Sequence, residues 1–572
     1  MFKIFKRLPP IYTAAAILFL FVQIASILYL PYITRDIVNY GIMKGDLSYV
    51  WSKGLFMLLI SVGGVVGALF NTLIFSYLSY KLGGQLRSEI YSKAMQFSKH
   101  EFDKIGTSAL ITRNTNDVTQ VQTLVEMSLK FLIMAPVMFI GGIFMTYLLS
   151  PTLALVFIAM IPFLIIVYII IYRIANPLYS KMQKLLDKLN LYFREGLTGA
   201  RVIRAFGKDN EEYDKYKSVN NEYTKTAVKA GTIMSFFVPF ITLLISLATI
   251  WITWLGGKGI NNGTMQIGDI MACVGYSAQI LMGFAMMTNI MTIIPRGQTS
   301  AKRIYEVLDM PLSITDSATP ANVKGTSLVF EHVDFRYQGA NRKTLQDISF
   351  TVNGGQTLSI IGSTGDGKTS LVNLISRMYD VESGSVSIGG TDVRKLSEEK
   401  LHNIVSVVQQ KSTLFFGTIR SNLLIAKPDA TDDEIWRALD MAQASEFVRL
   451  LDKGLDSAVD KGGGNFSGGQ KQRLCIARAL LKQASIYVLD DSFSALDFKT
   501  DRAVRTSIKA NLKNAITVIV AQRISTVMGA DMIAVLDNGR LTGLGTHDEL
   551  KENNAVYKEI IKSQLYNEEM AI

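Results

Sequence analysis

The segment LSIIGSTGDGKTS, residues 358–370, decides the fold of the second half of this 572-residue chain. It opens with the pattern of a short buried strand at 358–361 and passes into a helical pattern from Ser370. The glycine-rich loop between them has the spacing of a phosphate-binding loop, in which backbone N–H groups and a lysine hold phosphates and a hydroxyl binds Mg²⁺. The residues expected at the phosphates are Gly362, Ser363, Thr364, Gly365, Asp366, Gly367, Lys368, Thr369 and Ser370. This segment predicts an α/β nucleotide-binding domain.

Upstream of that domain the chain is dominated by long apolar runs with few acidic residues. A helix needs about 20 apolar residues to cross the hydrocarbon core of a bilayer. The segments that satisfy this requirement are residues 11–33, 55–80, 128–149, 152–175, 232–255 and 269–294. The first run lacks a clear small-residue cleavage site, so we expect a retained helix and not a signal peptide. The predicted fold class is a membrane α-helical domain with six spans (residues 1–310), a linker (311–326) and an α/β P-loop ATPase domain (327–572).

Basic side chains mark the loops that we expect on the cytoplasmic side of the membrane. They lie between the second and third spans and between the fourth and fifth: Lys81, Arg87, Lys93, Lys99, Lys104 and Arg113, then Lys181, Lys184, Lys188, Arg194, Arg201 and Arg204. Both loops continue the helical pattern of their flanking spans, so we expect them to project into the cytosol as helices. The segments around Phe102–Thr112 and Tyr213–Lys225 are predicted to form transverse coupling helices that dock on the ATPase domain.

The formal net charge is +11, from 59 Lys and Arg against 48 Asp and Glu. Because the positive excess lies in loops beside apolar segments and not in a compact basic domain, membrane orientation explains it better than nucleic-acid binding does. We expect membrane lipid and no nucleic acid as a partner. The two cysteines, Cys273 and Cys475, fall in a membrane segment and in the soluble half, so neither a mutual disulfide nor a metal-ligand cluster is expected.

A second motif, FSGGQKQR at residues 466–473, shortly precedes an apolar strand pattern that ends at Asp490. It resembles the signature motif of ABC (ATP-binding cassette) ATPases in sequence and in position. Together with the six spans, it makes the chain similar to an ABC exporter half-transporter over nearly its whole length. The resemblance implies that two ATPase domains pair head to tail, with each ATP between one chain's phosphate loop and the other chain's signature. The signature residues at the partner's ATP would be Ser467, Gly468, Gly469 and Gln470.

The same resemblance assigns roles to several further residues. Tyr337 is similar to the tyrosine that stacks on adenine, and Gln410 to the glutamine that senses Mg²⁺ and contacts the coupling helices. Asp490 resembles the carboxylate that orders Mg²⁺, together with Thr369 and Gln410. Asp497 lies in the segment that resembles the D-loop. ATP and Mg²⁺ are the cofactors that the resemblance implies.

At its two candidate catalytic positions the chain departs from the family pattern. Asp491 stands where the family has a glutamate that orients the attacking water, and Gln522 stands where it has a histidine at the γ-phosphate. Aspartate is one methylene shorter, and a misplacement of about 1 Å can cost about 10²-fold in rate. Glutamine forms hydrogen bonds but cannot carry a positive charge. We expect a degenerate site that binds ATP and hydrolyses it slowly; the alternative is that Asp491 still acts as a slow base.

These features predict a plasma-membrane subunit of a heterodimeric bacterial exporter, in which a second ABC half-transporter supplies the competent glutamate and histidine. The sixth span is rich in adaptable apolar side chains, namely Met282, Phe284, Met286, Met287 and Met291. Methionine conforms to varied apolar ligands. Small hydrophobic or amphipathic compounds, as in multidrug efflux, are the expected substrates. A lipid or peptide exporter and a regulatory ATP-gated membrane protein are the alternatives. The six spans argue against a soluble ATPase of nucleic-acid metabolism.

The charge asymmetry of the loops generates a prediction about topology. Residues 81–127 and 176–230 should face the cytoplasm, and residues 43–53 and 257–268 should face outward. In a background lacking Cys273 and Cys475, single cysteines at Asp46 and Asn262 should react with an impermeant thiol reagent in intact cells. Labelling of a cysteine at Lys104 but not at Asn262 would overturn the assignment.

Overall fold

The computed structural model describes residues 2–316 and 321–569. It divides into two compact units: Met1–Met95 with Ser108–Met310, called the membrane unit, and Gln96–Thr107 with Pro311–Ile572, called the ATPase unit. The side chains of residues 2, 128–129, 237–238, 288–292 and 565–569 lie outside the description, and with them that of Met291. The short segment Gln96–Thr107 thus clusters with the ATPase unit, although the sequence places it between two membrane spans.

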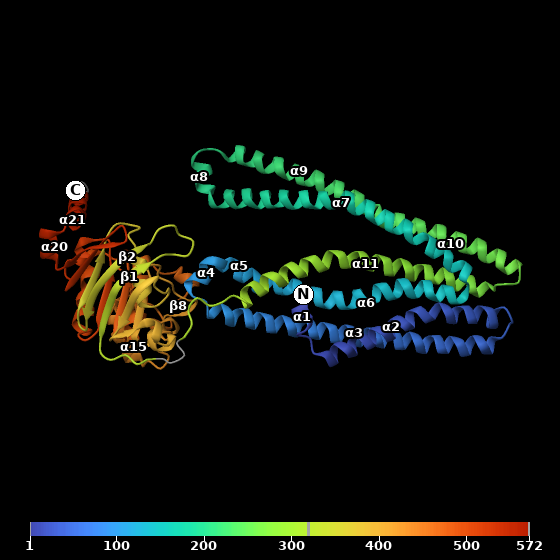
Figure 1. Cartoon of the computed structure of the whole chain (residues 1–572), viewed down its shortest axis with the longest axis horizontal. Coiled ribbons are helices and arrows are strands. Elements are labelled where there is room, and N and C mark those ends of the chain that lie inside the picture. The colour runs from blue at the N-terminus through green and yellow to red at the C-terminus, as the bar shows by residue number, and fades with distance from the viewer. Residues whose placement is uncertain (1, 317–320, 570–572) are drawn as a thin grey trace. The chain divides into compact units, whose positions relative to one another are not determined.

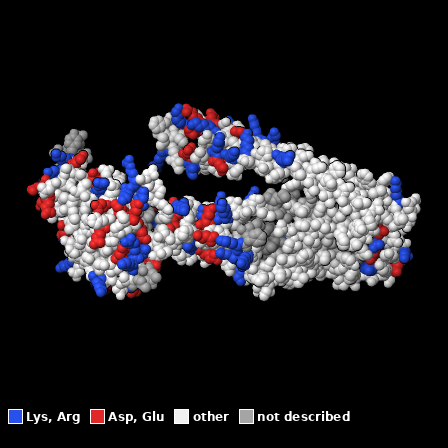
Figure 2. Space-filling model, viewed as in Figure 1, with Lys and Arg blue, Asp and Glu red and all other residues white. Residues whose placement is uncertain are grey.

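The membrane unit consists of helices (Figure 1). They are α1 (Phe2–Phe5), α2 (Pro10–Asp36), the π-helix η1 (Ile37–Ile42), α3 (Leu47–Met95), α5 (Thr107–Thr112), the π-helix η2 (Arg113–Asp117), α6 (Val118–Leu149), α7 (Pro151–Thr198), α8 (Ala200–Ala205), α9 (Asp209–Ser235), α10 (Phe237–Asn261) and α11 (Ile267–Leu308). Within the described residues, 6 helical stretches are long and apolar enough to cross a membrane, which confirms the predicted spans. In Figure 2 charged side chains gather toward the two ends of the membrane unit and leave a zone without charged side chains between them, as expected of a unit that spans a membrane.

The hairpin formed by α7, α8 and α9 differs from the sequence-based expectation. Helices α7 and α9 lie side by side, and the short helix α8 joins them at the tip (Figure 1). The predicted transverse segment, Tyr213–Lys225, lies inside the long helix α9, so this prediction was wrong. The breaks fall instead at Gly199 and at Gly207, whose φ of 61° is a conformation that glycine adopts without steric cost.

Helix α11 is held near both of its ends by side chains from π-helical segments, a type of turn that is frequent at functional sites. Near its start, the Gly268 N–H donates to Asn39 Oδ1 of η1 at 2.7 Å. Nearer its end, Ser300 Oγ donates to Asp117 Oδ1 of η2 at 2.7 Å. Both Asn39 and Asp117 are buried, so each hydrogen bond is sheltered from water. These contacts tie α11 to η1, which continues α2, and to η2, which leads into α6.

Small residues let α6 and α11 approach closely along their shared length. A Cβ atom at Gly283 would lie 2.7 Å from the backbone nitrogen of Phe139 and 2.9 Å from the carbonyl oxygen of Ala135. A Cβ atom at Gly142 would lie 2.8 Å from Cγ1 of Ile280. Glycine at such positions is typical of membrane helices whose backbones pack against each other.

The ATPase unit is built on two main sheets. The first is four-stranded with the order β2-β1-β4-β5, the second is six-stranded with the order β12-β11-β3-β10-β9-β6, and a small ribbon joins β7 to β8. The strands are β1 (Ser327–Phe335), β2 (Leu345–Asn353), β3 (Thr357–Ile361), β4 (Ser383–Ile388), β5 (Thr391–Asp392), β6 (Val405–Val408), β7 (Gly417–Thr418), β8 (Ala458–Val459), β9 (Ile486–Asp490), β10 (Ile516–Val520), β11 (Met532–Asp537) and β12 (Arg540–Gly545). Strands β6, β9, β10, β3 and β11 run parallel, as expected of an α/β domain.

The ATPase unit also contains helices, of which all but α4 lie between or after the strands in the sequence. They are α4 (Lys99–Ile105), α12 (Lys368–Ile375), α13 (Glu398–Ile404), α14 (Ile419–Leu423), α15 (Asp432–Met441), α16 (Ser445–Arg449), α17 (Gly468–Leu481), α18 (Phe498–Asn511), α19 (Ile524–Val527), α20 (His547–Asn553) and α21 (Ala555–Glu569), with 3₁₀ turns η3 (Val393–Lys395), η4 (Gly454–Asp456) and η5 (Lys461–Gly463). Strands β9 and β10 are buried along their whole length, which explains why the sequence there is a continuous apolar run.

The close approach of α6 and α11 generates a stability prediction. Gly283→Ala places a methyl group against backbone atoms that cannot rotate away, and overpacking of this kind typically costs about 1–3 kcal/mol. Gly84→Ala in α3 is the matched control, because a Cβ atom there would meet nothing within 4 Å. Thermal unfolding of the purified protein should show a lower midpoint for the first variant and an unchanged or higher midpoint for the second. Equal midpoints would show that the helices separate without cost.

Candidate active site

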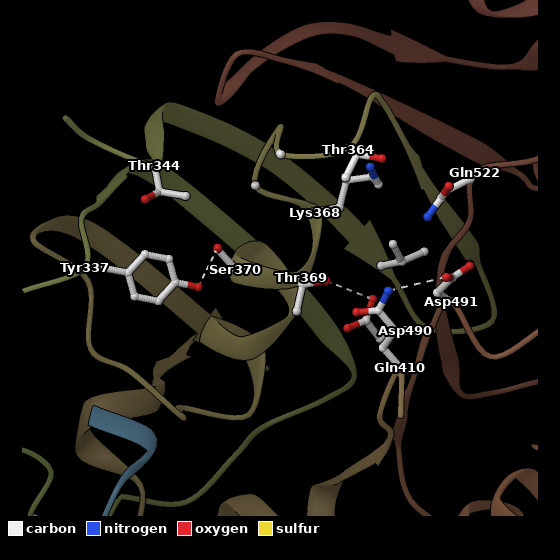
Figure 3. A pocket seen from close by; sticks show the side chains of 13 residues that line it. Tyr337, Thr344, Thr364, Lys368, Thr369, Ser370, Gln410, Asp490, Asp491 and Gln522 are labelled. Carbon is white, nitrogen blue, oxygen red and sulfur yellow. Dashed lines mark hydrogen bonds between the residues drawn. The ribbon is translucent and has the colours of Figure 1, made fainter. Parts of the chain in front are cut away.

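Most of the predicted site residues lie at or just after the carboxyl ends of four parallel strands, β3, β6, β9 and β10, whereas Tyr337 follows β1 of the other sheet. Such ends share one edge of a sheet, which is where open α/β sheets bind their ligands. They surround a cavity of about 290 Å³ (Figure 3). Its lining residues are Tyr337, Thr344, Thr364, Gly365, Gly367, Lys368, Thr369, Ser370, Gln410, Asp490, Asp491, Val520 and Gln522.

The cavity brings together most of the residues that the sequence indicates for one chain's own nucleotide site. Thr344 and Val520 are the lining residues that the sequence reasoning did not find, since neither belongs to a recognisable motif. Gly362, Ser363 and Asp366 do not line the cavity. Asp366 instead shapes the loop, because its carboxylate accepts hydrogen bonds from the Ser363 N–H at 2.5 Å and from the Asn538 N–H at 3.1 Å.

The glycine-rich loop connects β3 to α12 and wraps around a lysine. Gly367 has a φ of 93°, and a Cβ atom there would lie 2.8 Å from Cδ2 of Leu345, so only glycine fits without strain. Lys368 Nζ donates to the carbonyl oxygens of Gly362 at 2.8 Å and Ser363 at 2.7 Å. Burial lowers the pKa of Lys368. A phosphate anion bound in the loop would favour the charged form of the Lys368 ammonium group, which burial disfavours.

Thr369 and Asp490 form the candidate Mg²⁺ position. The Thr369 hydroxyl donates to Asp490 Oδ1 at 3.3 Å. Burial, together with the charge of neighbouring Asp491, raises the pKa of Asp490. Carboxylate and hydroxyl oxygens are ligands that Mg²⁺ accepts, and the positive ion would relieve the cost of keeping this carboxylate charged. The residues present therefore fit the metal.

Asp491 occupies the position expected for the base, in an unusual backbone conformation. Its φ is 48°, in the left-handed region where a residue with a side chain is uncommon. Its N–H donates to the Val520 carbonyl at 3.0 Å, which fixes the turn, and burial raises the pKa of its carboxyl. Gln410 Nε2 donates to Asp491 Oδ2 at 3.5 Å, a long contact that joins the end of β6 to the end of β9.

Gln522 lines the cavity from the loop after β10 and is exposed (Figure 3). The backbone of this loop is held by Gln564 of helix α21. Gln564 Nε2 donates to the Gln522 carbonyl at 2.6 Å, and Gln564 Oε1 accepts from the Ile524 N–H at 2.8 Å. One amide thus holds the backbone at Gln522 and two residues beyond it. The sequence gave no signal for this contact, because Gln564 lies 42 residues beyond Gln522 and outside any motif.

The predicted signature residues lie apart from the cavity and form the start of α17. Ser467 caps this helix: its hydroxyl accepts from the Gln470 N–H at 3.3 Å, while Gln470 Oε1 accepts from the Ser467 N–H at 2.9 Å. Such a reciprocal capping box satisfies donors that the first turn leaves free. Ser467 and Gly468 are exposed, so this helix start presents a surface for another group. None of the four signature residues lines the chain's own cavity among the described residues.

The segment of the predicted D-loop joins the signature helix to the end of β9. Gln472 Nε2 donates to Ser494 Oγ at 3.3 Å, and Gln472 Oε1 accepts from the Ala495 N–H at 3.0 Å. Asp497 then caps α18, where it accepts from the Thr500 N–H at 2.9 Å. The hydrogen bond from the Thr500 backbone N–H, and after it the hydrogen bond from the Thr500 hydroxyl, lower the pKa of Asp497. Asp497 is therefore a structural cap as well as a candidate interface residue.

Comparison with known proteins gives matches along both halves of the chain. Residues 13–284 match the family model of the ABC transporter transmembrane region, and residues 345–494 match that of the ABC transporter. An uncharacterized ABC transporter ATP-binding protein of Mycobacterium tuberculosis is 39% identical over 544 residues, which is 94% of this chain and 93% of the relative. The uncharacterized ABC transporter ATP-binding protein YfiB of Bacillus subtilis is 34% identical over 97% of this chain and 96% of its own length.

Two further comparisons concern export. A probable multidrug resistance ABC transporter ATP-binding/permease protein of Bacillus subtilis, YheI, is 31% identical over 84% of this chain and 82% of its own. Among solved structures, a bacterial Atm1-family ABC exporter with ATP bound aligns with a TM-score of 0.80, at 24% identity over 97% of this chain and 98% of that chain. This last likeness shows that the chain has the exporter fold.

The opposite pKa shifts of two site carboxylates generate a prediction about stability and pH. Asp490 has a raised pKa, so its charge destabilises the folded state at pH 7.5, and this cost vanishes only below the unfolded pKa of about 3.9. Asp497 has a lowered pKa, so its charge stabilises above about pH 3.9, and this gain is lost as the pH falls through the folded pKa. In nucleotide-free protein at pH 7.5, Asp490→Asn should raise the unfolding midpoint and Asp497→Asn should lower it. Shifts of the same sign would contradict the assignment.

Proposed function

Because the chain belongs to the ABC transporter family, as a half-transporter of the exporter type, we propose that it is one subunit of an ATP-driven heterodimeric exporter. Its own nucleotide site would bind MgATP and hydrolyse it slowly, and its signature would complete the active site of the partner. The observation that carries this proposal is the pair Asp491 and Gln522 at the two positions where the family has its catalytic glutamate and histidine.

The ATP-binding half of the proposal is supported by a cavity that has each element a nucleotide needs. Lys368 and the loop N–H groups would hold the phosphates, and Thr369 and Asp490 would hold Mg²⁺, which neutralises phosphate charge. Tyr337 lines the same cavity and offers an aromatic face for the base. The named relatives are ATP-binding transporters, and the solved Atm1-family exporter was obtained with ATP bound.

Slow hydrolysis is proposed because both changed groups lie in this cavity. The Asp491 carboxylate is held by its left-handed backbone and by Gln410, so it has little freedom to move toward a water that a longer side chain would reach. Gln522 offers an amide where a histidine would carry charge. General-base and charge-stabilising groups are typically worth about 10² to 10⁴ in rate. Loss of both groups would slow hydrolysis enough for the site to keep its nucleotide bound.

The heterodimer is proposed from the contrast between the two surfaces of this domain. The exposed start of α17, with Ser467 and Gly468, keeps the sequence and the cap of a working signature. This chain has an intact signature and a changed hydrolytic site. We therefore expect a partner with an intact catalytic glutamate and histidine and a changed signature. A homodimer would instead contain two changed sites and no competent one.

For the cargo we propose small hydrophobic or amphipathic compounds. Met282 and Met287 of α11 are 47% and 38% exposed in the single chain, and Met286 packs against a small core around Met134 and Met138. Flexible, polarisable side chains suit varied apolar ligands. A lipid or peptide exporter remains the alternative within transport, and an ATP-gated regulatory protein is the alternative outside it. Uptake into inverted vesicles separates them, since only a pump accumulates the compound against its gradient when ATP is supplied.

The asymmetry of the two sites generates an ordered prediction for the assembled transporter. Asp491→Asn should leave a substantial part of the ATPase activity, because this carboxylate is already poorly placed. Replacing the partner's catalytic glutamate by glutamine should remove most turnover, by about 10² to 10⁴-fold. Ser467→Ala should also lower turnover, although Ser467 lies outside this chain's own cavity.

Steady-state ATPase assays in reconstituted membranes measure this ordering, and each variant should first be shown to assemble. If Asp491→Asn abolishes hydrolysis as completely as the partner's change does, the site is not degenerate. A fully active homodimer of this chain would equally refute the proposal.

A further inference from the structure

Helix α4 is built into the ATPase unit by buried polar contacts. Glu101 is 2% exposed, and its Oε1 accepts from the Ser313 N–H of the linker at 2.9 Å. Its Oε2 accepts from the Ser98 N–H at 2.7 Å, which closes a capping box at the helix start. Burial opposes ionisation of Glu101, but the hydrogen bonds from Ser98 and Ser313 outweigh it and lower the pKa. The carboxylate therefore fixes α4 to the chain that enters the ATPase domain.

A second contact joins α4 to the body of the ATPase domain. The Tyr379 hydroxyl donates to Asp103 Oδ2 of α4 at 2.9 Å. Tyr379 is 8% exposed and lies shortly after α12, the helix that begins with the phosphate-binding lysine. Asp103 itself is exposed, so this bond joins a buried hydroxyl to a carboxylate at the surface and should shift a docking equilibrium by about two- to tenfold. Docking of α4 thus depends on where the Tyr379 ring lies.

The position of Tyr379 depends in turn on two aromatic rings. Its centroid lies 5.3 Å from that of Tyr337 at an interplanar angle of 88°, and 5.4 Å from that of Phe335. The Phe335 and Tyr337 centroids are 4.9 Å apart, so the three rings form a closed triangle. Edge-to-face contacts of this kind prefer defined orientations. Reorientation of one ring therefore requires its neighbours to adjust.

Tyr337 is the member of this triangle that lines the nucleotide cavity (Figure 3). Its hydroxyl lies 2.7 Å from Ser370 Oγ, near the start of α12. A base stacked on Tyr337 would restrict the ring, whereas phosphates bound by Lys368 alone would not touch it. An unbroken series of contacts thus leads from the base end of the cavity through Tyr337 and Tyr379 to Asp103.

We propose that Tyr379 is a positioning residue that reports adenine occupancy of the cavity to helix α4. It rests on the proposed function in taking Tyr337 to face adenine and this site to retain ATP. Since α4 lies in the sequence between α3 and the segment leading to α6, its docking bears directly on two membrane helices. A site that retains ATP without hydrolysing it would then hold α4 docked through many transport cycles.

The test is hydrogen–deuterium exchange of the α4 peptide in the assembled transporter with full-length chains. MgATP should slow exchange of residues 99–105 by about two- to tenfold, the effect of one partly exposed hydrogen bond. Magnesium tripolyphosphate, which fills the phosphate end without a base, should not slow it. Tyr379→Phe should abolish the ATP-dependent slowing while changing ATP affinity by less than about threefold, because it removes one hydroxyl remote from the phosphates. Asp103→Ala should have the same effect, and the double variant should add nothing.

Tyr557→Phe is the matched control, since Tyr557 is also buried and has one comparable contact, 2.8 Å to His547 Nδ1. It should retain the full ATP-dependent slowing. If Tyr379 had a purely structural role, Tyr379→Phe would speed exchange of the α4 peptide by the same factor with and without ATP. The slowing caused by ATP would then persist in the variant, and that result would overturn the inference. Slowing by tripolyphosphate also overturns it. If Lys368→Ala leaves ATP binding by this chain unchanged, the proposed function itself fails; if ATP binds and α4 does not respond, only this inference fails.

Discussion

The parallel pairing of β10 with β3 on one side and β9 on the other is the constraint on which the nucleotide site depends. In this register Val520 lies opposite both Ile360 and Asp490, so the three strands end level with one another. A slip of one residue would turn the side chains to the opposite face and separate Asp490 from Thr369. The buried apolar side chains of β9 and β10 resist such a slip. Hydrophobic burial in the sheet therefore sets the positions of the charged groups at its edge.

Much of this architecture could be predicted from the sequence, because its strongest signals are local. The phosphate loop, the signature and the apolar spans are each read within a single short window. The contacts of Thr344 and Gln564 could not be read in this way, since they arise only when distant elements meet. The tip of the hairpin formed by α7, α8 and α9 was predicted at the wrong place, because the polar pattern of α9 continues through Tyr213–Lys225. The breaks between these helices fall at two glycines outside that segment, Gly199 and Gly207.

Under the proposed function, binding and hydrolysis fall to groups in different parts of the ATPase domain. Of the groups that would contact phosphate and metal, Lys368 at the start of α12 and Asp490 at the end of β9 are buried. The two changed groups lie on turns at the rim, one in a left-handed backbone and one exposed. If the site is degenerate as proposed, the changes at the rim would leave the buried frame intact, and the site would lose its chemistry without losing its shape. The same frame supports the signature helix through Gln472, which keeps that surface in order.

The membership of α4 in the ATPase unit has a consequence for biosynthesis. Asp103 and its partner Tyr379 are separated by 276 residues in the chain. At a synthesis rate of about 5 to 20 residues per second, Asp103 is synthesised roughly 14 to 55 s before Tyr379. During that interval the buried carboxylate of Glu101 also lacks its bond from the linker. The first half of the chain therefore waits in the membrane with an unfinished cytoplasmic end, and chaperones or proteases have their best access to the nascent protein there.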